Sequence, residues 1–422
     1  MIWSVTAIAG VSLAIWLYLV ALRGGFWRAD RRLDEDLAAP AARSAPPAWP
    51  AVVALVPARD EAEVIGRSLA ALLAQDYPGR FRIVLVDDHS RDGTAEIALH
   101  TAEIASHTTD VARHTAGAAQ RLSVVAARAL PSGWSGKLWA LSEGLAHAEA
   151  AAPEVPYLWL SDADIEHGTA TLRRLVAKAE DQRLDLVSLM VALSCRGFWE
   201  RLLIPPFIYF FQMLYPFAWV NDRRKGTAAA AGGCMLLRRD ALARAGGFEA
   251  IKGELIDDCA LARRIKDLPS SGDGTRGIWL GLTATSRSIR PYRGLGDIWR
   301  MVARSAYTQL GHSPLLLLGT LIGLALTFLV PPLVGLSAEI HGDKVAAILG
   351  ISTWSLMALS AVPTYRLYRQ PVWLAAFLPL AAAFYAAMTL ESALRHWRGA
   401  GGLWKGRVEP SAREVAHKPQ DL

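Results

Sequence analysis

Three short acidic clusters contain the residues of this chain that are best suited to chemistry. Each follows or contains an apolar run, and the clusters lie at residues 85–88, 158–164 and 255–258. A carboxylate at the end of a buried strand is costly to desolvate unless it binds a metal, accepts hydrogen bonds or exchanges a proton. With hydrophobic segments at both ends of the chain, the clusters predict a membrane-tethered enzyme that handles a nucleoside diphosphate.

The second cluster contains an Asp-x-Asp motif, formed by Asp162 and Asp164. In an extended segment these two side chains point to the same side. Their hard oxygen atoms suit Mg²⁺ or Mn²⁺, which keep several waters and bridge the phosphates of a substrate. Such a metal neutralises the charge that develops on a departing nucleoside diphosphate. We therefore expect a divalent metal, Mn²⁺ or Mg²⁺, at Asp162 and Asp164, with a chance occurrence of the motif as the alternative.

The other two clusters can bind a donor and accept a proton. Asp87 and Asp88, which precede a turn, are placed to accept hydrogen bonds from the ribose or base of a nucleotide sugar; a solvated turn is the alternative. Asp257 and Asp258 open a predicted helix at 260–266, where a carboxylate can take the proton from an acceptor hydroxyl. The alternative there is a carboxylate that only interacts with the helix dipole.

Glycine-rich segments with nearby basic residues complete this set. Residues 133–137 (Gly-Trp-Ser-Gly-Lys) precede a predicted helix, so their backbone can approach a phosphate or sugar while Lys137 supplies positive charge. The segment lacks the spacing of a Walker P-loop, and ATP hydrolysis is therefore not indicated. Gly232 and Gly233 precede a predicted strand at 235–239, which suggests close backbone passage near an acceptor pocket.

Two further features have a structural alternative. Arg304 is placed to clamp a diphosphate with its forked donors, or to anchor the chain at a membrane surface. His100, His107 and His114 recur every seven residues in an Ala/Thr-rich insertion. Because they have no carboxylate partners, this spacing predicts one face of a surface helix rather than a metal site.

Alternating strands and helices must position these residues. Continuous apolar runs predict buried parallel strands, and periodic segments predict helices between them. The predicted strands are 52–56, 82–86, 123–126 and 157–160, and the predicted helices are 63–74, 94–105 and 138–148. This order predicts an α/β fold with right-handed crossovers and a mostly parallel sheet. Ligands bind such sheets at the carboxyl ends of the strands, where the first two acidic clusters fall.

The two ends of the chain are predicted to lie in a membrane. The sequence is 52% hydrophobic with a mean hydropathy of +0.23, too apolar for an ordinary soluble enzyme. The predicted organisation is an N-terminal transmembrane helix at 1–22, a basic and Pro/Ala-rich linker at 23–50, a catalytic domain at 51–310, transmembrane segments within 315–394 and a basic tail at 395–422. Residues 198–220, which contain Pro205, Pro206 and Pro216, are predicted to form an interfacial helix beside the active site.

Charge and cysteine content exclude several classes of protein. The net charge is +6, but no basic stripe is interleaved with aromatics, so nucleic-acid binding is not indicated. Many arginines instead flank apolar runs, as the positive-inside rule expects. Three cysteines without a C-x-x-C pair indicate neither a disulfide framework nor a zinc knuckle, and a reducing cytoplasm is expected for the catalytic domain. Three C-terminal crossings would place the basic tail outside, against its charge, so the number of crossings stays open.

In their order, these motifs resemble glycosyltransferase family 2, which has the GT-A fold. The resemblance covers roughly residues 51–304 and rests on the segments 56–61, 75–78, 86–94, 162–164 and 257–261. The segments 133–137, 301–310 and 404–407 look most like the hopene-associated glycosyltransferases of bacterial hopanoid gene clusters. Ceramide glucosyltransferases and carotenoid glycosyltransferases are similar at a greater distance.

The resemblance implies an inverting transfer of a sugar from a nucleotide-sugar donor, UDP-linked in the expected case, to the hydroxyl of a lipid acceptor, with a hopanoid suspected. It implies that Asp87 and Asp88 hold the nucleoside, that Asp164 binds the metal with Asp162 close to the ribose or sugar, and that Asp258 is the base. The expected donor-side residues are Pro57, Arg59, Glu61, Asp87, Asp88, Lys137, Asp162 and Arg304, and the expected acceptor-side residues are Gly232, Gly233 and Asp257.

The chain departs from the family around Arg304. Many relatives carry Gln/Arg-x-x-Arg-Trp, whereas Met301 and Ser305 stand here. The acceptor-side aromatic residue is thus missing, which disfavours processive polysaccharide synthesis. The expected location is the bacterial inner (cytoplasmic) membrane, as a multi-pass protein with its catalytic domain in the cytoplasm.

Several alternatives remain open at this point. A polyprenyl phosphate, a ceramide-like lipid or diacylglycerol can replace the hopanoid as acceptor. A metal-dependent nucleotidyltransferase uses the same Asp-x-Asp chemistry but releases pyrophosphate. A non-catalytic membrane scaffold on the same fold is the third class, and the presence of all three acidic clusters argues against it.

Overall fold

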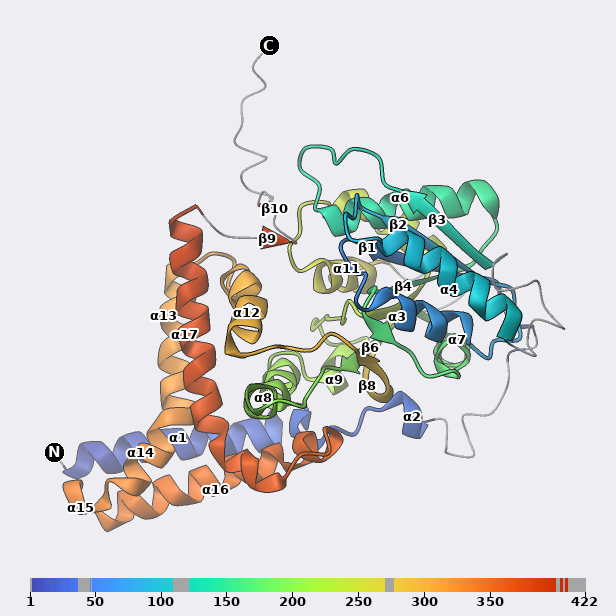
Figure 1. The fold of residues 1–422 in the computed structure, drawn as a ribbon. Helices are drawn as coiled ribbons and strands as arrows, with labels where there is room; N and C mark the ends of the chain where they lie inside the picture. Colours follow the sequence, from blue (N-terminus) through green and yellow to red (C-terminus); the bar gives the residue numbers. More distant parts are fainter. Residues whose placement is uncertain are drawn as a thin grey trace. The chain divides into compact units, whose positions relative to one another are not determined.

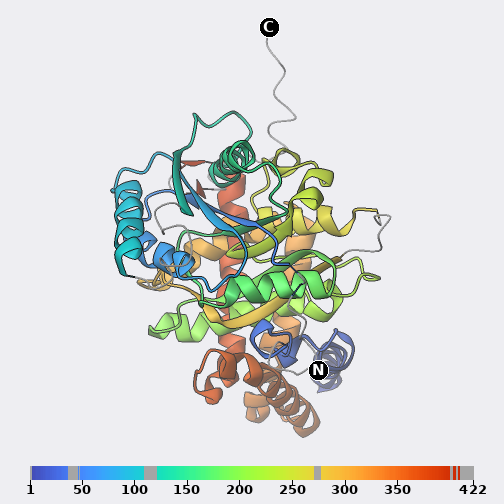
Figure 2. The same ribbon diagram turned by 90° about the vertical axis from the view of Figure 1, so that its right-hand side faces the viewer.

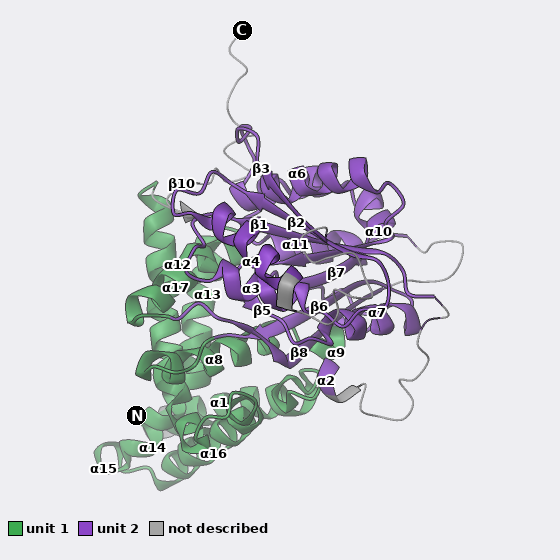
Figure 3. Cartoon of the chain, turned by 45° about the vertical axis from the view of Figure 1, so that its right-hand side comes forward, with its two compact units in different colours: residues 1–30, 194–219, 292–401 green, residues 31–193, 220–291, 402–422 purple. Residues whose placement is uncertain are grey.

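The computed structural model describes residues 2–36, 46, 48–108, 121–269, 277–399, 403–404 and 407–408. The chain divides into two compact units, each assembled from discontinuous segments (Figure 3). The sheet unit comprises residues 31–193, 220–291 and 402–422, and the helical unit comprises residues 1–30, 194–219 and 292–401. Of the predicted catalytic domain at 51–310, residues 194–219 and 292–310 belong to the helical unit, and the domain bounds stay a prediction.

An eight-stranded sheet forms the centre of the sheet unit in the part of the chain that is described (Figure 1), in the order β3-β2-β1-β4-β7-β6-β8-β5. Its strands are β1 (Val52–Ala58), β2 (Phe81–Asp87), β3 (Leu122–Ala126), β4 (Tyr157–Ser161), β5 (Ile165–Glu166), β6 (Leu184–Ala192), β7 (Cys234–Arg238) and β8 (Gly277–Ser288). The first four pair in parallel as predicted. The rest of the sheet is mixed, since β7 is antiparallel to both β4 and β6, β6 is parallel to β8, and β5 is antiparallel to β8.

Helices cover both faces of this sheet. They are α2 (Leu33–Asp36), α3 (Ile65–Leu73), α4 (Thr94–Thr108), α6 (Gly136–Ala151), α7 (Thr171–Asp181), α10 (Arg239–Arg244), η3 (Phe248–Ile251) and α11 (Asp257–Lys266). Helices α3 and α4 lie side by side on one face (Figures 1 and 2). On the other face, α6 approaches β1 at Gly144, where an added Cβ would lie 3.4 Å from Leu55. Burial on both faces explains why the strands are continuous apolar runs.

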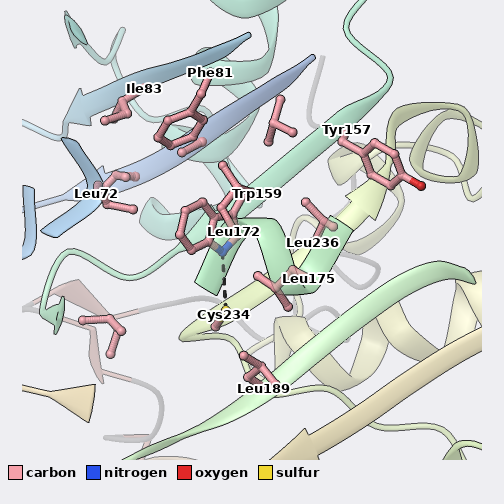
Figure 4. Packing of buried hydrophobic residues seen from close by; sticks show 14 of the residues in the cluster. Leu72, Phe81, Ile83, Tyr157, Trp159, Leu172, Leu175, Leu189, Cys234 and Leu236 are labelled. Atoms are coloured by element: carbon pink, nitrogen blue, oxygen red, sulfur yellow. Dashed lines mark hydrogen bonds between the residues drawn. The ribbon is translucent and has the colours of Figure 1, made fainter. Parts of the chain in front are cut away.

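The main hydrophobic core of the sheet unit is centred on Trp159 of β4 (Figure 4). Trp159 is fully buried, packs 6.0 Å from the ring of Phe81, and its indole N–H donates to Cys234 Sγ at 3.4 Å. The bond joins β4 to the first residue of β7. The same tryptophan thus stabilises the two strands whose ends carry the Asp-x-Asp motif and the Gly232–Gly233 pair.

Of the three histidines predicted to share a helix face, His100 lies within α4. His100 is exposed and pairs with Glu103 at 3.7 Å, as a surface helix would have it. The side chain of His107 and all of His114 lie outside the described residues.

The helical unit contains the apolar segments. Its elements are α1 (Ile2–Leu22), η1 (Phe26–Arg28), α8 (Phe198–Leu214), most of α9 (Phe217–Val220), α12 (Leu295–Gln309), α13 (Pro314–Leu324), η4 (Ala325–Leu329), α14 (Val330–Leu336), α15 (Ala338–His341), α16 (Lys344–Leu367), η5 (Val372–Phe377) and α17 (Leu378–Trp397). Within the described residues, four helices are long and apolar enough to cross a membrane: Val5–Leu22, Pro314–Leu336, Lys344–Leu367 and Val372–Trp397. They match the predicted segments. Strands β9 (Leu403–Trp404) and β10 (Arg407–Val408) form an antiparallel pair that belongs to the sheet unit.

A π-helical turn, η4, interrupts the second of these apolar helices. A π-turn leaves backbone carbonyls without their usual helical partners. Two side chains of α1 donate to them: Ser12 Oγ to Leu326 O and Trp16 Nε1 to Thr327 O, both at 2.7 Å. Both donors are fully buried. In an apolar environment such bonds are required, because no water can satisfy the carbonyls.

Helix α8 covers most of the segment that was predicted to be interfacial. It runs through Pro205 and Pro206 and ends before Pro216, so only the last proline breaks it. Tyr209 is fully buried and shares a hydrogen bond of 2.6 Å with Ser360 of α16, while Tyr385 Oη of α17 donates to Leu203 O at 2.7 Å. These contacts attach α8 to α16 and α17 within the helical unit. The interfacial location of α8 stays a prediction.

Candidate active site

The order and direction of the strands bring the acidic clusters to one edge of the sheet. Strands β1, β2 and β4 are parallel, so the residues that follow them emerge together. Strand β7 runs the other way, with Cys234 opposite Ser161, and therefore begins at that same edge. Gly232 and Gly233 are thus placed beside the end of β4. Strand β8 is parallel to β6, which is antiparallel to β7, so β8 also ends there, at Ser288.

The loops after β1 and β2 are tied to each other. Arg59 Nη1 donates to Asp88 O at 2.6 Å and to Asp88 Oδ2 at 3.1 Å, and Asp88 is only 1% exposed. Asp87 is half-buried and accepts the Ser90 N–H at 3.3 Å. Asp87 is thus the more accessible of the two predicted nucleoside ligands, and Asp88 is paired with Arg59.

Backbone contacts fix the position of Glu61 in the first of these loops. The Glu61 N–H donates to Thr94 Oγ1 and the Ala62 N–H to Asp92 Oδ2, each at 2.9 Å. Asp92 Oδ1 also accepts the Thr94 hydroxyl at 2.5 Å. Because Thr94 begins α4, these hydrogen bonds join the two loops to the first turn of that helix.

Lys137 links two of the predicted clusters. Its Nζ lies 3.0 Å from Asp162 Oδ1 and 3.4 Å from Asp257 Oδ2. Burial by itself lowers the pKa of Lys137, but Asp162, Asp257 and Asp258 raise it more, so the net pKa is above its ordinary value. The pKa of Asp162 is raised by burial, with Lys137 opposing the effect. Lys137 is the second residue of α6, and the hydroxyl of Ser135 caps this helix by accepting the Leu138 N–H at 3.3 Å.

Asp258 is held by two backbone donors. The Gly232 N–H reaches Oδ2 at 2.8 Å, and the Cys259 N–H reaches Oδ1 at 2.7 Å. Burial and then the neighbouring Asp257 raise the pKa of Asp258 to about 6, against the opposing effects of Lys137 and the two N–H groups. A carboxylate with this pKa can accept a proton near neutral pH. A Cβ on Gly232 would lie 3.0 Å from Lys137 Nζ and 3.3 Å from Asp258 Oδ2, which explains why glycine suits this position.

A pocket with about 210 Å³ of empty space, part of it open to solvent, lies among these groups. Polar and backbone groups from several elements line it together with apolar side chains. The lining residues are Pro57, Lys137, Leu141, Leu160, Ser161, Asp162, Gly232, Met235 and Asp257. Five of the predicted site residues, each from a different segment of the chain, therefore share one cavity.

A second polar group, which sequence reasoning missed, surrounds Asp164. Ser288 Oγ donates to Asp164 Oδ2 at 2.9 Å, and Arg290 Nε lies 3.3 Å from the same oxygen. Arg290 Nη2 also pairs with Glu61 Oε2. Arg290 lies two residues after the end of β8, and the apolar run at 278–282 was the signal that a strand precedes it. The predicted donor-side Glu61 and the predicted metal ligand Asp164 thus meet through one arginine.

A third group, also missed, lies beneath the Asp-x-Asp turn. His167 is 3% exposed, and its ring nitrogens contact Ser161 Oγ at 2.9 Å and Ser286 Oγ at 3.1 Å. Burial lowers the pKa of His167 to about 3, so the ring is neutral and links β4 to β8 through two hydroxyls. In the sequence, the position of His167 three residues after Asp164 was the signal that could have identified it as a neighbour of the motif.

Arg304 does not belong to the sheet unit. It is exposed on α12 of the helical unit, so its predicted contact with a diphosphate stays a prediction.

Asp162 and Asp164 fit a divalent cation that also has ligands from the substrate. No group of three or more His, Cys, Asp or Glu side chains forms a metal cluster among the described residues. Mg²⁺ and Mn²⁺, however, are commonly held by one or two carboxylates together with substrate phosphates and waters. Carboxylates also outnumber cations at this edge of the sheet, which opposes binding of a diphosphate unless a further cation joins it. The two aspartates therefore suit a metal that is bound with the substrate.

The family model for glycosyl transferase family 2 matches residues 53–246. No curated protein sequence matches the chain. Among solved structures, a mannosyltransferase from Pyrobaculum calidifontis, in complex with GDP-Man and Mn²⁺, is 20% identical with a TM-score of 0.50, and the match covers 96% of this chain and 100% of that one. Glucosyl-3-phosphoglycerate synthase from Mycobacterium tuberculosis is 16% identical with a TM-score of 0.37, over 66% of this chain and 82% of that one.

The likeness to the mannosyltransferase, at 20% identity, shows the fold, which agrees with the predicted GT-A arrangement of a mixed α/β sheet. The family match covers β1 through β7 and includes the loops that carry Asp87, Lys137, Asp162 and Gly232. Residues 53–246 are therefore a glycosyltransferase family 2 domain, and the chain is an enzyme of the glycosyltransferase class.

Proposed function

We propose that this protein is a membrane-bound inverting glycosyltransferase that moves a sugar from a nucleotide sugar to the hydroxyl of a lipid. The observation that carries the proposal is the double contact of Lys137 with Asp162 and Asp257, at 3.0 and 3.4 Å. It puts the Asp-x-Asp motif, where a donor diphosphate is expected, next to the Asp257–Asp258 pair, where a base is expected. A donor and an acceptor hydroxyl can then meet in one pocket.

In the proposed reaction Asp258 is the general base. The acceptor oxygen attacks the anomeric carbon and forms the new C–O bond, while the bond from that carbon to the donor diphosphate breaks and its electron pair leaves with the nucleoside diphosphate. The hydroxyl proton passes to Asp258, whose carboxylate is oriented by the N–H groups of Gly232 and Cys259. Attack from the side opposite the leaving group inverts the anomeric centre.

Donor binding is assigned to the groups at the ends of β1, β2 and β4. Asp87, the accessible carboxylate, is proposed to accept hydrogen bonds from the nucleoside, and Arg59 to keep Asp88 in place beside it. Lys137 supplies positive charge to the diphosphate, and Arg304 is proposed to add more. Asp162 and Asp164 would hold a divalent cation, which supplies neutralisation of the leaving diphosphate when bound.

Two nucleotides and two metals are candidates for the donor site. The resemblance to family 2 favours a UDP-sugar, whereas the Pyrobaculum mannosyltransferase holds GDP-Man with Mn²⁺. Both nucleotides therefore belong in the first assays, with Mn²⁺ and Mg²⁺ compared.

A lipid acceptor is supported by the four helices that are long and apolar enough to cross a membrane. The arginines beside these segments support the proposed bacterial inner-membrane location, with the sheet unit in the cytoplasm. A hopanoid is the acceptor favoured by the resemblance of residues 133–137 and 301–310. Polyprenyl phosphate, diacylglycerol and ceramide-like lipids are the alternatives.

The test uses the full chain in detergent micelles, with labelled UDP- and GDP-sugars, Mn²⁺ or Mg²⁺, and each acceptor lipid in turn. A labelled lipid together with a released nucleoside diphosphate supports the proposal. Release of pyrophosphate would identify a nucleotidyltransferase instead. Mass spectrometry of lipids from cells with and without the gene then identifies the natural product, and an unchanged lipid profile would argue against a lipid acceptor.

A further inference from the structure

Arg290 combines three properties that the proposed reaction has not yet used. It contacts the second aspartate of the Asp-x-Asp motif through Nε, at 3.3 Å from Asp164 Oδ2. It contacts Glu61 through Nη2, and its side chain remains 40% exposed. One guanidinium thus joins two acidic residues at the edge of the sheet and stays within reach of a ligand.

The oxygen that Arg290 contacts already has a second donor. Asp164 Oδ2 accepts from Ser288 Oγ at 2.9 Å as well as from Arg290. A divalent cation that binds Asp164 needs lone pairs of this carboxylate, so it competes with the positive charge of Arg290. The divalent cation and the Arg290 guanidinium repel each other at short range, so the guanidinium must move when the metal binds to Asp164.

A displaced Arg290 has an obvious new partner. A guanidinium presents a planar fork of donors that matches phosphate oxygens, and such charge-assisted bonds are among the strongest in proteins. A donor that binds together with the metal brings two phosphates to the same carboxylates. The negative charge of the phosphates then pairs with Arg290 in place of the Asp164 carboxylate.

Resting on the proposed function, we propose that Arg290 is a donor-phosphate ligand that Asp164 and Glu61 hold in place until a divalent cation binds at Asp164. Without donor and metal, the arginine neutralises the two carboxylates. When both bind, it exchanges these carboxylates for the diphosphate. Arg290 therefore weakens binding of the metal alone and strengthens binding of the nucleotide with the metal.

The experiment measures two affinities of the full chain in detergent. The first is for Mn²⁺ alone, followed by electron paramagnetic resonance, and the second is for UDP and GDP at saturating Mn²⁺, followed by calorimetry. In Arg290→Gln, the affinity for Mn²⁺ is expected to rise about three- to tenfold, because a competing charge is removed. The affinity for the better nucleotide is expected to fall about tenfold or more, because a charge-assisted bond to phosphate is lost.

Two further variants serve as controls for these changes in Mn²⁺ and nucleotide affinity. Arg290→Lys keeps the charge and is expected to recover part of the nucleotide affinity. Arg287→Gln removes an exposed arginine three residues before Arg290, which pairs with Glu166 at 3.3 Å, and should change neither affinity. If Arg290 had only a structural role, its loss would loosen the site and weaken both the Mn²⁺ and the nucleotide affinity. A rise in one affinity with a fall in the other therefore distinguishes the proposed role from a structural one.

The outcomes separate this inference from the proposed function. Weakening of both affinities in Arg290→Gln, or no change in either, would overturn the role of Arg290 while leaving the transferase proposal intact. Absence of Mn²⁺-dependent nucleotide binding in the wild-type protein would overturn the proposed function and the phosphate role together. The Mn²⁺ measurement alone would still decide whether Arg290 competes for Asp164.

Discussion

Gly232 and Asp258 lie 26 residues apart in the sequence, yet the Gly232 N–H donates to Asp258 Oδ2 at 2.8 Å. The contact joins the loop before β7 to the first turn of α11. It orients the proposed base with a backbone group, which has no rotamers and cannot turn away. Substitutions at the two positions should therefore affect catalysis in different ways.

Asp258→Asn removes the proton acceptor but preserves the size of the side chain. Turnover is expected to fall by about two to four orders of magnitude, as for loss of a general base, while nucleotide affinity stays close to the wild-type value. Sugar transfer and nucleotide binding are measured on the same preparation. Wild-type turnover in this variant would reject Asp258 as the base.

The activity of the wild-type enzyme should depend on pH through Asp258. Only the deprotonated carboxylate can accept a proton, and its pKa is raised to about 6. Turnover is therefore expected to rise with pH up to about 6 and to level off above it. This rise should be absent in Asp258→Asn. A flat profile between pH 5 and 8, with intact protein throughout, would contradict this role.

Gly232→Ala tests the space around the same carboxylate. The new Cβ would lie 3.0 Å from Lys137 Nζ and 3.3 Å from Asp258 Oδ2, so one of the two side chains must shift. We expect turnover to fall at least about tenfold with little change in the thermal midpoint, because a lysine tip moves easily but catalytic geometry does not. Gly226→Ala, where nothing lies within 4 Å of the added Cβ, is the matched control and should retain wild-type turnover.

Asp164→Ala tests the metal assignment. Nucleotide binding is expected to lose its dependence on Mn²⁺, because the carboxylate that would hold the cation is gone. Asp76→Asn, an exposed residue that pairs with Arg173 at 2.9 Å, serves as the control for removing one acidic charge. Retained Mn²⁺ dependence in Asp164→Ala would count against the ligand role.

The helical unit allows a test of packing between two apolar helices. A Cβ on Gly350 of α16 would lie 2.7 Å from Gly335 N and 2.8 Å from Pro331 O of α14, so the helix backbones must separate. Gly350→Ala is expected to destabilise the protein by about 1–3 kcal/mol, the usual cost of overpacking. Gly319→Ala, with open space around its Cβ, should be neutral or slightly stabilising. Equal thermal midpoints in detergent would refute the close approach of the helices.

Much of the sheet unit could be predicted from the sequence, because the information is local. Strands buried on both faces must be continuously apolar, and this property located β1, β2 and β4, while β3 is a short, half-buried edge strand. The motif of Asp162 and Asp164 follows β4 directly, so its place at a strand end was also a local matter. The four apolar helices were located by length and composition, which is all that a bilayer requires.

Only the tertiary structure decided which distant residues meet. The reversed direction of β7 places Gly232 beside the end of β4, and no periodicity in the sequence records the direction of a strand. The same is true of Arg290, which reaches Glu61 across 229 residues of sequence, and of Ser12, which reaches the π-turn of η4 across 314. Local patterns determine what forms a strand or helix because burial acts on each segment separately. Contacts between segments depend on how the whole sheet is ordered, and that order is a property of the folded chain.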